Sequence, residues 1–261
     1  MIAPNSELLR IEGLDKHFGG LHAIRDLSVT VDRGLITAFI GPNGAGKTTI
    51  FNLVTGAIRP DQGNVTYEGR SITGLRPDQV AQAGIGRTYQ DLKLFGQLTC
   101  EENVLTAFPD QPGETVTATL FAWGRVQRRE AEIRERTSEI LAFVGLADKR
   151  HEMARDLGYA ESKMLALARV LALDAKLLML DEPCSGLDHG ALDKVRSVMK
   201  ELIAQGRTIC LIEHNMALVR EVADRGIFLE QGKLIASGDV ASLMANDGLR
   251  RRYLGLAADQ P

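Results

Sequence analysis

The most informative segment of this chain is Gly41-Pro42-Asn43-Gly44-Ala45-Gly46-Lys47-Thr48-Thr49. The apolar run 35–40 before it predicts a buried strand, and residues 49–54 after it predict a helix. In this context the backbone N–H groups of the loop form an anion site at the helix N-terminus. Lys47 can reach the β- and γ-phosphates and the Thr48 hydroxyl can bind Mg²⁺. The stretch predicts a nucleoside triphosphate site, the alternative being a glycine-rich turn without a ligand.

A second stretch, Leu177-Leu178-Met179-Leu180-Asp181-Glu182, predicts a buried strand that ends in two acids. Asp181 is placed to hold the water shell of a metal ion, and Glu182 to face an attacking water. The two stretches together indicate nucleotide hydrolysis. The alternative for the acids alone is an ordinary strand end that turns into solvent.

Length, composition and charge limit the classes of protein to which this chain can belong. The chain has 261 residues, enough for one sizeable core or two small lobes, and its net charge of −3 gives no reason to expect nucleic acid as a partner. Residues 1–7 lack the features of a signal peptide, and no apolar run approaches the ~18 residues of a membrane span. We therefore expect a soluble, cytoplasmic protein. The three cysteines have no metal-ligand spacing and are expected to be reduced.

The order of patterns predicts an α/β fold. Short β-like runs and turns fill residues 7–88, whereas 92–172 are helical in character. From Arg128 a charged helix is expected, with a solvated face that carries Glu130/Arg134 and Glu132/Arg136 pairs; its buried stripe comprises Ile133, Thr137, Ile140, Leu141 and Val144. Further strands are predicted at 177–180, 208–212, 225–230 and 233–237, with helices near 189–205 and 215–223. This order of elements predicts a mainly parallel α/β core that is interrupted by a helical insertion.

Over nearly its whole length the chain resembles the ATP-binding subunit of ABC transporters. The resemblance implies one domain, 1–261: a P-loop NTPase core (about 1–90 and 161–261), with an antiparallel β subdomain and an inserted helical subdomain (about 91–160). It also implies ATP and Mg²⁺ as cofactors. The signature of the family, Leu-Ser-Gly-Gly-Gln, falls on Leu157-Gly158-Tyr159-Ala160-Glu161. The serine and the neutral glutamine are missing, and Tyr159 and Ala160 stand at the two glycine positions, of which the tyrosine is common in the LivG-type group. This degenerate signature favours a heterodimer with a second, related ATPase subunit.

Other landmarks of the family fall on single residues. Phe18 matches the aromatic that stacks on adenine, and Gln90 the glutamine that reaches the metal and the attacking water. Ser185-Gly186-Leu187-Asp188 matches the loop that crosses to the partner subunit, and His214 the histidine that bonds the γ-phosphate. Glu182 would be the general base, and Lys47 would stabilise the transferred phosphoryl group. The alternatives are that Phe18 is a core or exposed residue without a role in adenine binding, and that His214 has a structural role only.

A narrower resemblance is to the LivG-type ATPases of branched-chain amino acid importers. It is carried by Phe18-Gly19-Gly20-Leu21-His22-Ala23, the stretch 86–99, Ile212-Glu213-His214-Asn215-Met216 and the ending Tyr253-Leu254-Gly255. ATPases of lipopolysaccharide or lipid export are the alternative. The long insertion at about 106–135 favours the importer over this alternative. A soluble, non-transport ABC protein is a third hypothesis.

The importer hypothesis implies partners and a location. Two transmembrane permease subunits would bind the chain on the cytoplasmic face of the plasma (inner) membrane, and an extracytoplasmic substrate-binding protein would take part indirectly. Leu92, Leu94, Phe95 and Leu98 lie in an apolar stretch, 90–99, that we expect to dock a cytoplasmic helix of a permease. The alternative is that they pack the core of the helical lobe.

Overall fold

The computed structural model describes residues 7–109, 123–246 and 248. Two compact units make up the chain. The first comprises Met1–Arg87, Lys176–Ser185 and Met199–Pro261, and the second Thr88–Ala175 and Gly186–Val198. Tyr253–Gly255 and residues 110–122 of the expected insertion lie outside the described residues.

An antiparallel sheet lies in the first unit, with strand order β2-β1-β4-β5. Its strands are β1 (Glu7–Phe18), β2 (Leu21–Asp32), β4 (Gln62–Tyr67) and β5 (Arg70–Ser71). β1 and β2 form a hairpin in which Phe18 pairs with Leu21 and His17 with His22. Gly19 and Gly20 make the turn, and Gly19 has φ +57°, a left-handed conformation that glycine adopts without strain.

A six-stranded sheet, order β10-β9-β3-β8-β7-β6, forms the centre of the same unit. The strands are β3 (Ile36–Ile40), β6 (Ile85–Arg87), β7 (Leu177–Asp181), β8 (Thr208–Ile212), β9 (Arg225–Glu230) and β10 (Lys233–Asp239). All pairs are parallel except β9 with β10. Every residue of β3, β7 and β8 is buried, which explains their continuous apolar sequences.

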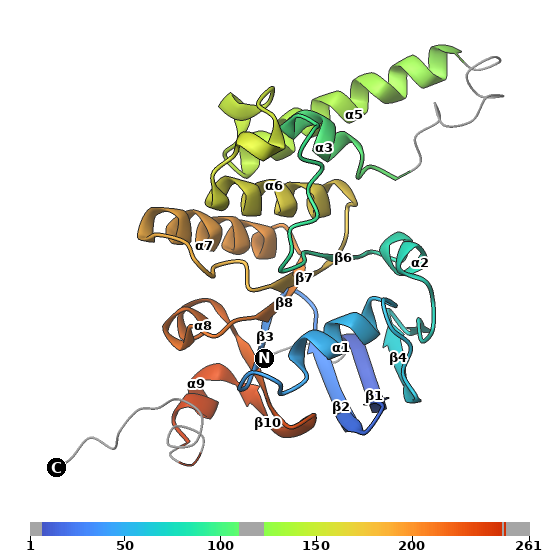
Figure 1. The fold of residues 1–261 in the computed structure, drawn as a ribbon, viewed down its shortest axis with the longest axis vertical. Coiled ribbons are helices and arrows are strands. Elements are labelled where there is room, and N and C mark those ends of the chain that lie inside the picture. The colour runs from blue at the N-terminus through green and yellow to red at the C-terminus, as the bar shows by residue number, and fades with distance from the viewer. Residues whose placement is uncertain (1–6, 110–122, 247, 249–261) are drawn as a thin grey trace. The chain divides into compact units, whose positions relative to one another are not determined.

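Both faces of this sheet are covered (Figure 1). Phe39 packs with α1 (Lys47–Val54) and the antiparallel sheet in one large apolar cluster. Ala38 and Ile40, on the opposite face of β3, pack with α8 (Met216–Val222) and α9 (Val240–Met244). A further helix, α2 (Pro77–Gln82), precedes β6. The alternation along β3 thus builds a layered α/β core.

The second unit is helical. It contains α3 (Cys100–Leu105), α5 (Trp123–Phe143), α6 (Tyr159–Ala172), two short 3-10 turns (Ala147–Lys149 and Ala154–Asp156), and the start of α7 (His189–Ala204), whose later residues belong to the first unit. α3, α5 and α6 pack against one another. The predicted stripe of α5 is confirmed, with Ile140 half-buried and its other members buried.

One detail of α5 differs from the prediction. Glu132 pairs with Arg129 at 2.9 Å, and Arg136 lies 3.9 Å from Asp174 at the end of a neighbouring segment. The i,i+3 spacing also places two side chains on one helix face, so a sequence with several nearby arginines offers Glu132 alternative partners.

The predicted strands and helices of the first unit are confirmed, with shifts of a few residues at their ends. Cys100, Cys184 and Cys210 are buried, and none of them forms a disulfide in the described part of the chain. Among the described helices none is both long and apolar enough to cross a bilayer. The domain boundaries near residues 90 and 160 stay predictions.

Candidate nucleoside triphosphate site

Three chain segments meet at one edge of the central sheet. β3, β8 and β7 are parallel neighbours, with Phe39 and Asp181 both in register with Ile212. β3 leads into the glycine-rich loop, β7 ends at Asp181-Glu182, and β8 leads into Glu213-His214. The carboxyl ends of parallel strands are where open α/β sheets bind ligands.

At two glycines of the loop, a side chain would collide with the surrounding atoms. Gly41 has φ +155°, and a Cβ there would lie 2.2 Å from the carbonyl oxygen of Leu229. Gly46 has φ +100°, and its Cβ would lie 2.6 Å from Ile24 Cδ1 and 2.9 Å from the carbonyl oxygen of Ala23. Gly46 is also the N-cap of α1. The packing of the unit therefore fixes the loop in one shape at the start of a helix.

Lys47 lies within this loop. Its ammonium donates to the carbonyl oxygens of Gly41 (2.7 Å) and Pro42 (3.0 Å). Burial lowers the pKa of Lys47, and the charges of Glu182 and Asp181 oppose that shift. The cation is thereby held beside the loop and close to the two acids. The neighbouring Thr48 is exposed and Thr49 is half-buried.

Asp181 ends β7 as a buried acid. Burial raises the pKa of Asp181, and the Arg87 guanidinium, 3.4 Å from Oδ2, opposes the shift. Arg87 also donates to Asn52 Oδ1 (2.7 Å) and Thr55 Oγ1 (3.2 Å), and its guanidinium lies 5.5 Å from the ring of Phe51. Arg87 therefore ties the acid to α1, the helix that begins at the phosphate loop.

Glu182 is the next residue and has a different environment. Its φ of +49° places it in the left-handed region, which costs a non-glycine residue about 1 kcal/mol or more. Its N–H donates to the carbonyl of Ile212 (2.9 Å), and its Oε1 lies 2.7 Å from His214 Nε2. The turn thus aims the two acids differently, Asp181 toward Arg87 and Glu182 toward His214.

The ligand groups at this edge suit a magnesium nucleotide. A hydroxyl from Thr48 and a carboxylate from Asp181 are hard oxygen ligands of the kind that Mg²⁺ binds, together with waters and substrate phosphates. His214 also lines a pocket beside the loop, whose walls are Ile40, Gly41, Pro42, Glu213, His214, Met216 and Glu230. An anion bound by the loop, a metal ion and a carboxylate beside a histidine are sufficient parts for phosphoryl transfer to water.

The signature segment lies in the second unit, at the start of α6. Gly158 is the N-cap, and its N–H donates to Glu161 Oε2 (2.9 Å). Glu161 Oε1 pairs with Lys149 at 2.9 Å, and these two contacts lower the pKa of Glu161, Lys149 having the larger effect. Tyr159 is 53% exposed, and its ring lies against Gly186 of the segment 185–188.

The structure therefore gathers Lys47, Asp181, Glu182 and His214 in the first unit, with Phe18 exposed at the end of β1. Gln90, the signature segment and Gly186-Leu187-Asp188 belong to the second unit, and Ser185 to the first. Gln90 is exposed, and Asp188 Oδ1 accepts the N–H of Ala191 in α7.

Sequence reasoning missed two residues of the site. One is Arg87, and the other is Glu213, which is buried and accepts the Cys184 N–H at 2.9 Å. In both cases a charged residue stands at or just after the end of a buried β-strand, which is a signal for a buried polar network.

The phosphate loop and paired acids at neighbouring strand ends define a P-loop nucleoside triphosphatase core. A family model described as ABC transporter matches residues 24–185. The chain is 36% identical to the high-affinity branched-chain amino acid transport ATP-binding protein LivG of Salmonella typhimurium, over 96% of this chain and 98% of the relative. It is 34% identical to BraF of Pseudomonas aeruginosa, with the same coverage.

Solved structures agree with this assignment. The ADP conformation of an ATP-binding cassette from an ABC transporter superposes with a TM-score of 0.82 at 31% identity, covering 96% of this chain and 99% of the other. A nucleotide-free cassette gives 0.80 at 30%, covering 93% and 96%. The chain belongs to the ABC transporter family and is an ATP-hydrolysing cassette, so the predicted family, fold class and enzyme class are confirmed.

Proposed function

We propose that this chain is the ATP-hydrolysing subunit of an importer for branched-chain or related amino acids, driving transport through separate permeases. The observation that carries the proposal is the match of nearly the whole chain to LivG at 36% identity, rather than of the phosphate loop alone. An exporter of lipid would use the same ATPase chemistry, so the substrate decides between the two.

The geometry of the first unit supports a role for each residue at the sheet edge. The loop 41–49 would bind the phosphates, with Lys47 at the β- and γ-phosphates. Thr48 and Asp181 would hold Mg²⁺, which neutralises charge on the phosphates when bound. Gln90 belongs to the second unit, and its role toward the metal rests on the family resemblance alone. Glu182 would take the proton of the attacking water. His214, 2.7 Å from Glu182, would orient that carboxylate and bond the γ-phosphate.

The adenine and the partner subunit complete the proposed site. Phe18 is 46% exposed, with the Lys16 ammonium 5.6 Å from its ring centroid, and its exposed part would stack on a base. Leu157–Glu161 would act on the ATP held by the partner, together with the loop Ser185–Asp188. Because the signature lacks a serine hydroxyl, the proposed partner is a related but different ATPase subunit.

We place the permease contact at 90–99. Asn103 is buried and holds this segment: its amide nitrogen donates to the carbonyls of Phe95, Leu98 and Thr99, and its amide oxygen accepts the Phe95 N–H. Phe95 itself is 49% exposed and lies 4.8 Å from the Arg169 guanidinium. A rigid loop with an exposed aromatic side chain is suited to burial against a permease helix. Cross-links from Lys93→Cys and Gln97→Cys to a permease on the cytoplasmic face of the membrane are expected, and labels that never reach it would exclude this docking site.

Uptake of labelled leucine, isoleucine and valine by cells that lack the chain tests the proposed function. The parental chain should restore uptake, whereas Glu182→Gln should keep ATP binding and abolish uptake, because the amide cannot take a proton. Glu12→Gln, at an exposed side chain of β1, is the control and should restore uptake fully. Equal uptake with and without the chain would refute the importer assignment, and parental hydrolysis by Glu182→Gln in the assembled complex would refute the base.

A further inference from the structure

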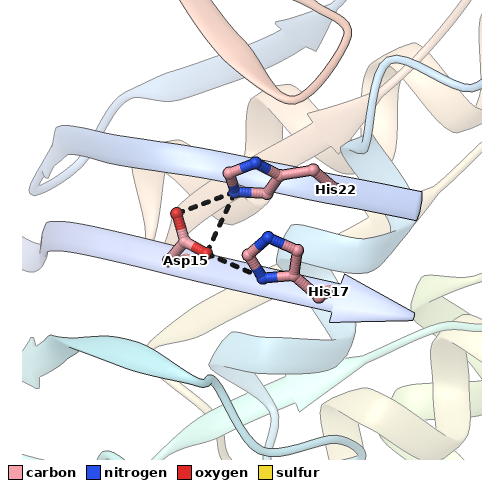
Figure 2. A group of neighbouring side chains, drawn as sticks. All are labelled: Asp15, His17 and His22. Atoms are coloured by element: carbon pink, nitrogen blue, oxygen red, sulfur yellow. Dashed lines mark hydrogen bonds and ion pairs between the residues drawn. The ribbon is translucent and has the colours of Figure 1, made fainter. Parts of the chain in front are cut away.

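Two histidines and an aspartate meet at the end of the β1–β2 hairpin, and none of them belongs to the phosphate loop (Figure 2). His17 and His22 are directly paired across the strands, and Asp15 precedes His17 by two residues on β1. Side chains of paired residues project on the same face of a sheet. The hairpin therefore brings two imidazoles and a carboxylate together without any contribution from distant segments.

The three side chains point their ligand atoms at one another. His22 Nε2 lies 2.9 Å from Asp15 Oδ2 and 3.0 Å from Oδ1, and His17 Nδ1 lies 3.2 Å from Oδ1. The rings stack with centroids 3.8 Å apart and 18° between their planes, and both turn a nitrogen toward Asp15. One ligand atom from each residue lies within 4.8 Å of the other two.

We propose that Asp15, His17 and His22 form a Zn²⁺ site that clamps the end of the hairpin. Zn²⁺ binds imidazole nitrogen at about 2.0–2.1 Å in tetrahedral geometry, so two ligand atoms of one ion lie roughly 3.3 Å apart. The distances from Asp15 to both rings are already close to this value. Two imidazoles with one carboxylate and a water in the fourth position is a recurrent Zn²⁺ ligand set.

The surroundings of the cluster hold its geometry. Asp61 Oδ2 accepts the backbone N–H of His17 at 2.6 Å and lies 3.5 Å from Nδ1 of the same residue, while its Oδ1 pairs with Lys16 at 2.7 Å. The Lys16 ammonium is thus bound to Asp61, and the backbone of a proposed ligand is fixed. Asp61 also places a negative charge beside Nδ1, the nitrogen of His17 that would bind the ion.

The proposed clamp lies next to the exposed aromatic Phe18. His17 directly precedes Phe18, and the turn of the hairpin, Gly19-Gly20, has no side chains to hold it. A metal ion that joins β1 to β2 at this point would restrict the ring that we propose for adenine, and this consequence rests on the proposed function. The metal site itself does not depend on it.

Isothermal titration of the metal-stripped full chain with Zn²⁺, without nucleotide, tests the site. One equivalent should bind, and the melting temperature should rise by about 5–10 °C at ~100-fold excess over Kd. His17→Ala or His22→Ala should weaken binding by at least about 10–100-fold, because each removes a ligand atom, and Asp61→Asn should weaken it by less. His151→Ala, which removes an exposed histidine of the second unit, is the matched control and should leave binding unchanged.

The outcomes distinguish Zn²⁺ binding at this site from binding elsewhere on the chain and from no binding. Parental chain that shows neither heat of binding nor a melting shift refutes the proposal, whatever the variants do. Binding that survives His17→Ala together with His22→Ala also refutes it, because the ion is then held elsewhere. Far-UV circular dichroism of each variant shows whether it is folded, and Zn²⁺ binding without any effect on ATP hydrolysis leaves the proposed function intact.

Discussion

Replacing Arg87 by Met tests whether the buried guanidinium is needed to keep an ionised Asp181 in the core. The side chains of both residues are about 4% exposed or less, and Nη2 lies 3.4 Å from Oδ2. Met has a similar length but no charge and no donor for Asn52 or Thr55. Removing one member of a buried ion pair costs about 3–5 kcal/mol, because a carboxylate then stays in a site of low polarity. The cost should appear as a fall in melting temperature of about 6–20 °C at neutral pH.

The pH dependence provides the sharper readout. Burial already raises the pKa of Asp181, and loss of Arg87 removes a charge that opposes the shift. A carboxyl group whose folded pKa lies above its unfolded value of about 3.9 binds more protons in the native state. Stability then decreases as pH rises through the folded pKa. The destabilisation by Arg87→Met should therefore be full at about pH 8 and smaller at about pH 5.

Thermal unfolding of the two chains, followed by circular dichroism at both pH values, makes the comparison. Arg76→Met removes an exposed arginine paired with Asp78 and should change stability by less than about 0.5 kcal/mol. Adding Asp181→Asn to Arg87→Met should recover part of the loss, since no charge remains to be buried. A loss below about 1 kcal/mol that is equal at both pH values would refute the reasoning.

Three further predictions concern nucleotide binding and turnover. Lys47→Ala should weaken ATP binding in a titration of the isolated chain, because the cation beside the loop is lost, and unchanged affinity would exclude its role. Gly46→Ala should abolish ATP binding, because a Cβ at position 46 would collide with Ile24 and with a carbonyl oxygen. Gly20→Ala should keep ATP binding, because a Cβ at position 20 would point into open space. Gly158→Ser with Ala160→Gly and Glu161→Gln should raise the ATPase rate of the chain alone by roughly 10–100-fold, the effect of one hydrogen bond to a charged group of about 1.5–3 kcal/mol; brisk hydrolysis by the parental chain and no gain would refute the heterodimer.

The middle strands of the central sheet, β3, β8 and β7, were predictable because they are buried on both faces. Such strands are continuous apolar runs, and the residues at or just after their ends, Gly41, Asp181 and His214, are then placed at one edge by the parallel pairing alone. The loop was predictable because its glycines and Lys47 are a local pattern. Both inferences use positions adjacent in sequence, or the fixed direction of parallel strands.

The contacts of Arg87 were not predictable in this way. Its partners Asn52, Thr55 and Asp181 come from a helix and from a strand that are separated in sequence by a whole helical unit. Which of several arginines near a strand end is buried depends on side-chain packing across these segments. The same reason applies to His17 and His22, whose spacing of five residues suggests nothing until the register of the hairpin pairs them.

The charge of Glu161 in the signature segment has a smaller expected effect in the structure than the sequence alone suggests. Glu161 adds a negative charge where the family has a neutral glutamine, and this argues against a bound polyphosphate. In the structure that charge is paired with Lys149 and accepts the N–H of Gly158, so part of it is balanced within the second unit. A carboxylate that is paired with a lysine, and exposed to dissolved salt that screens its charge, repels phosphate less than an isolated carboxylate does. Glu161→Gln alone should therefore raise the ATPase rate of the chain less than Gly158→Ser alone, and the opposite order would show that charge, rather than the missing hydroxyl, limits the site.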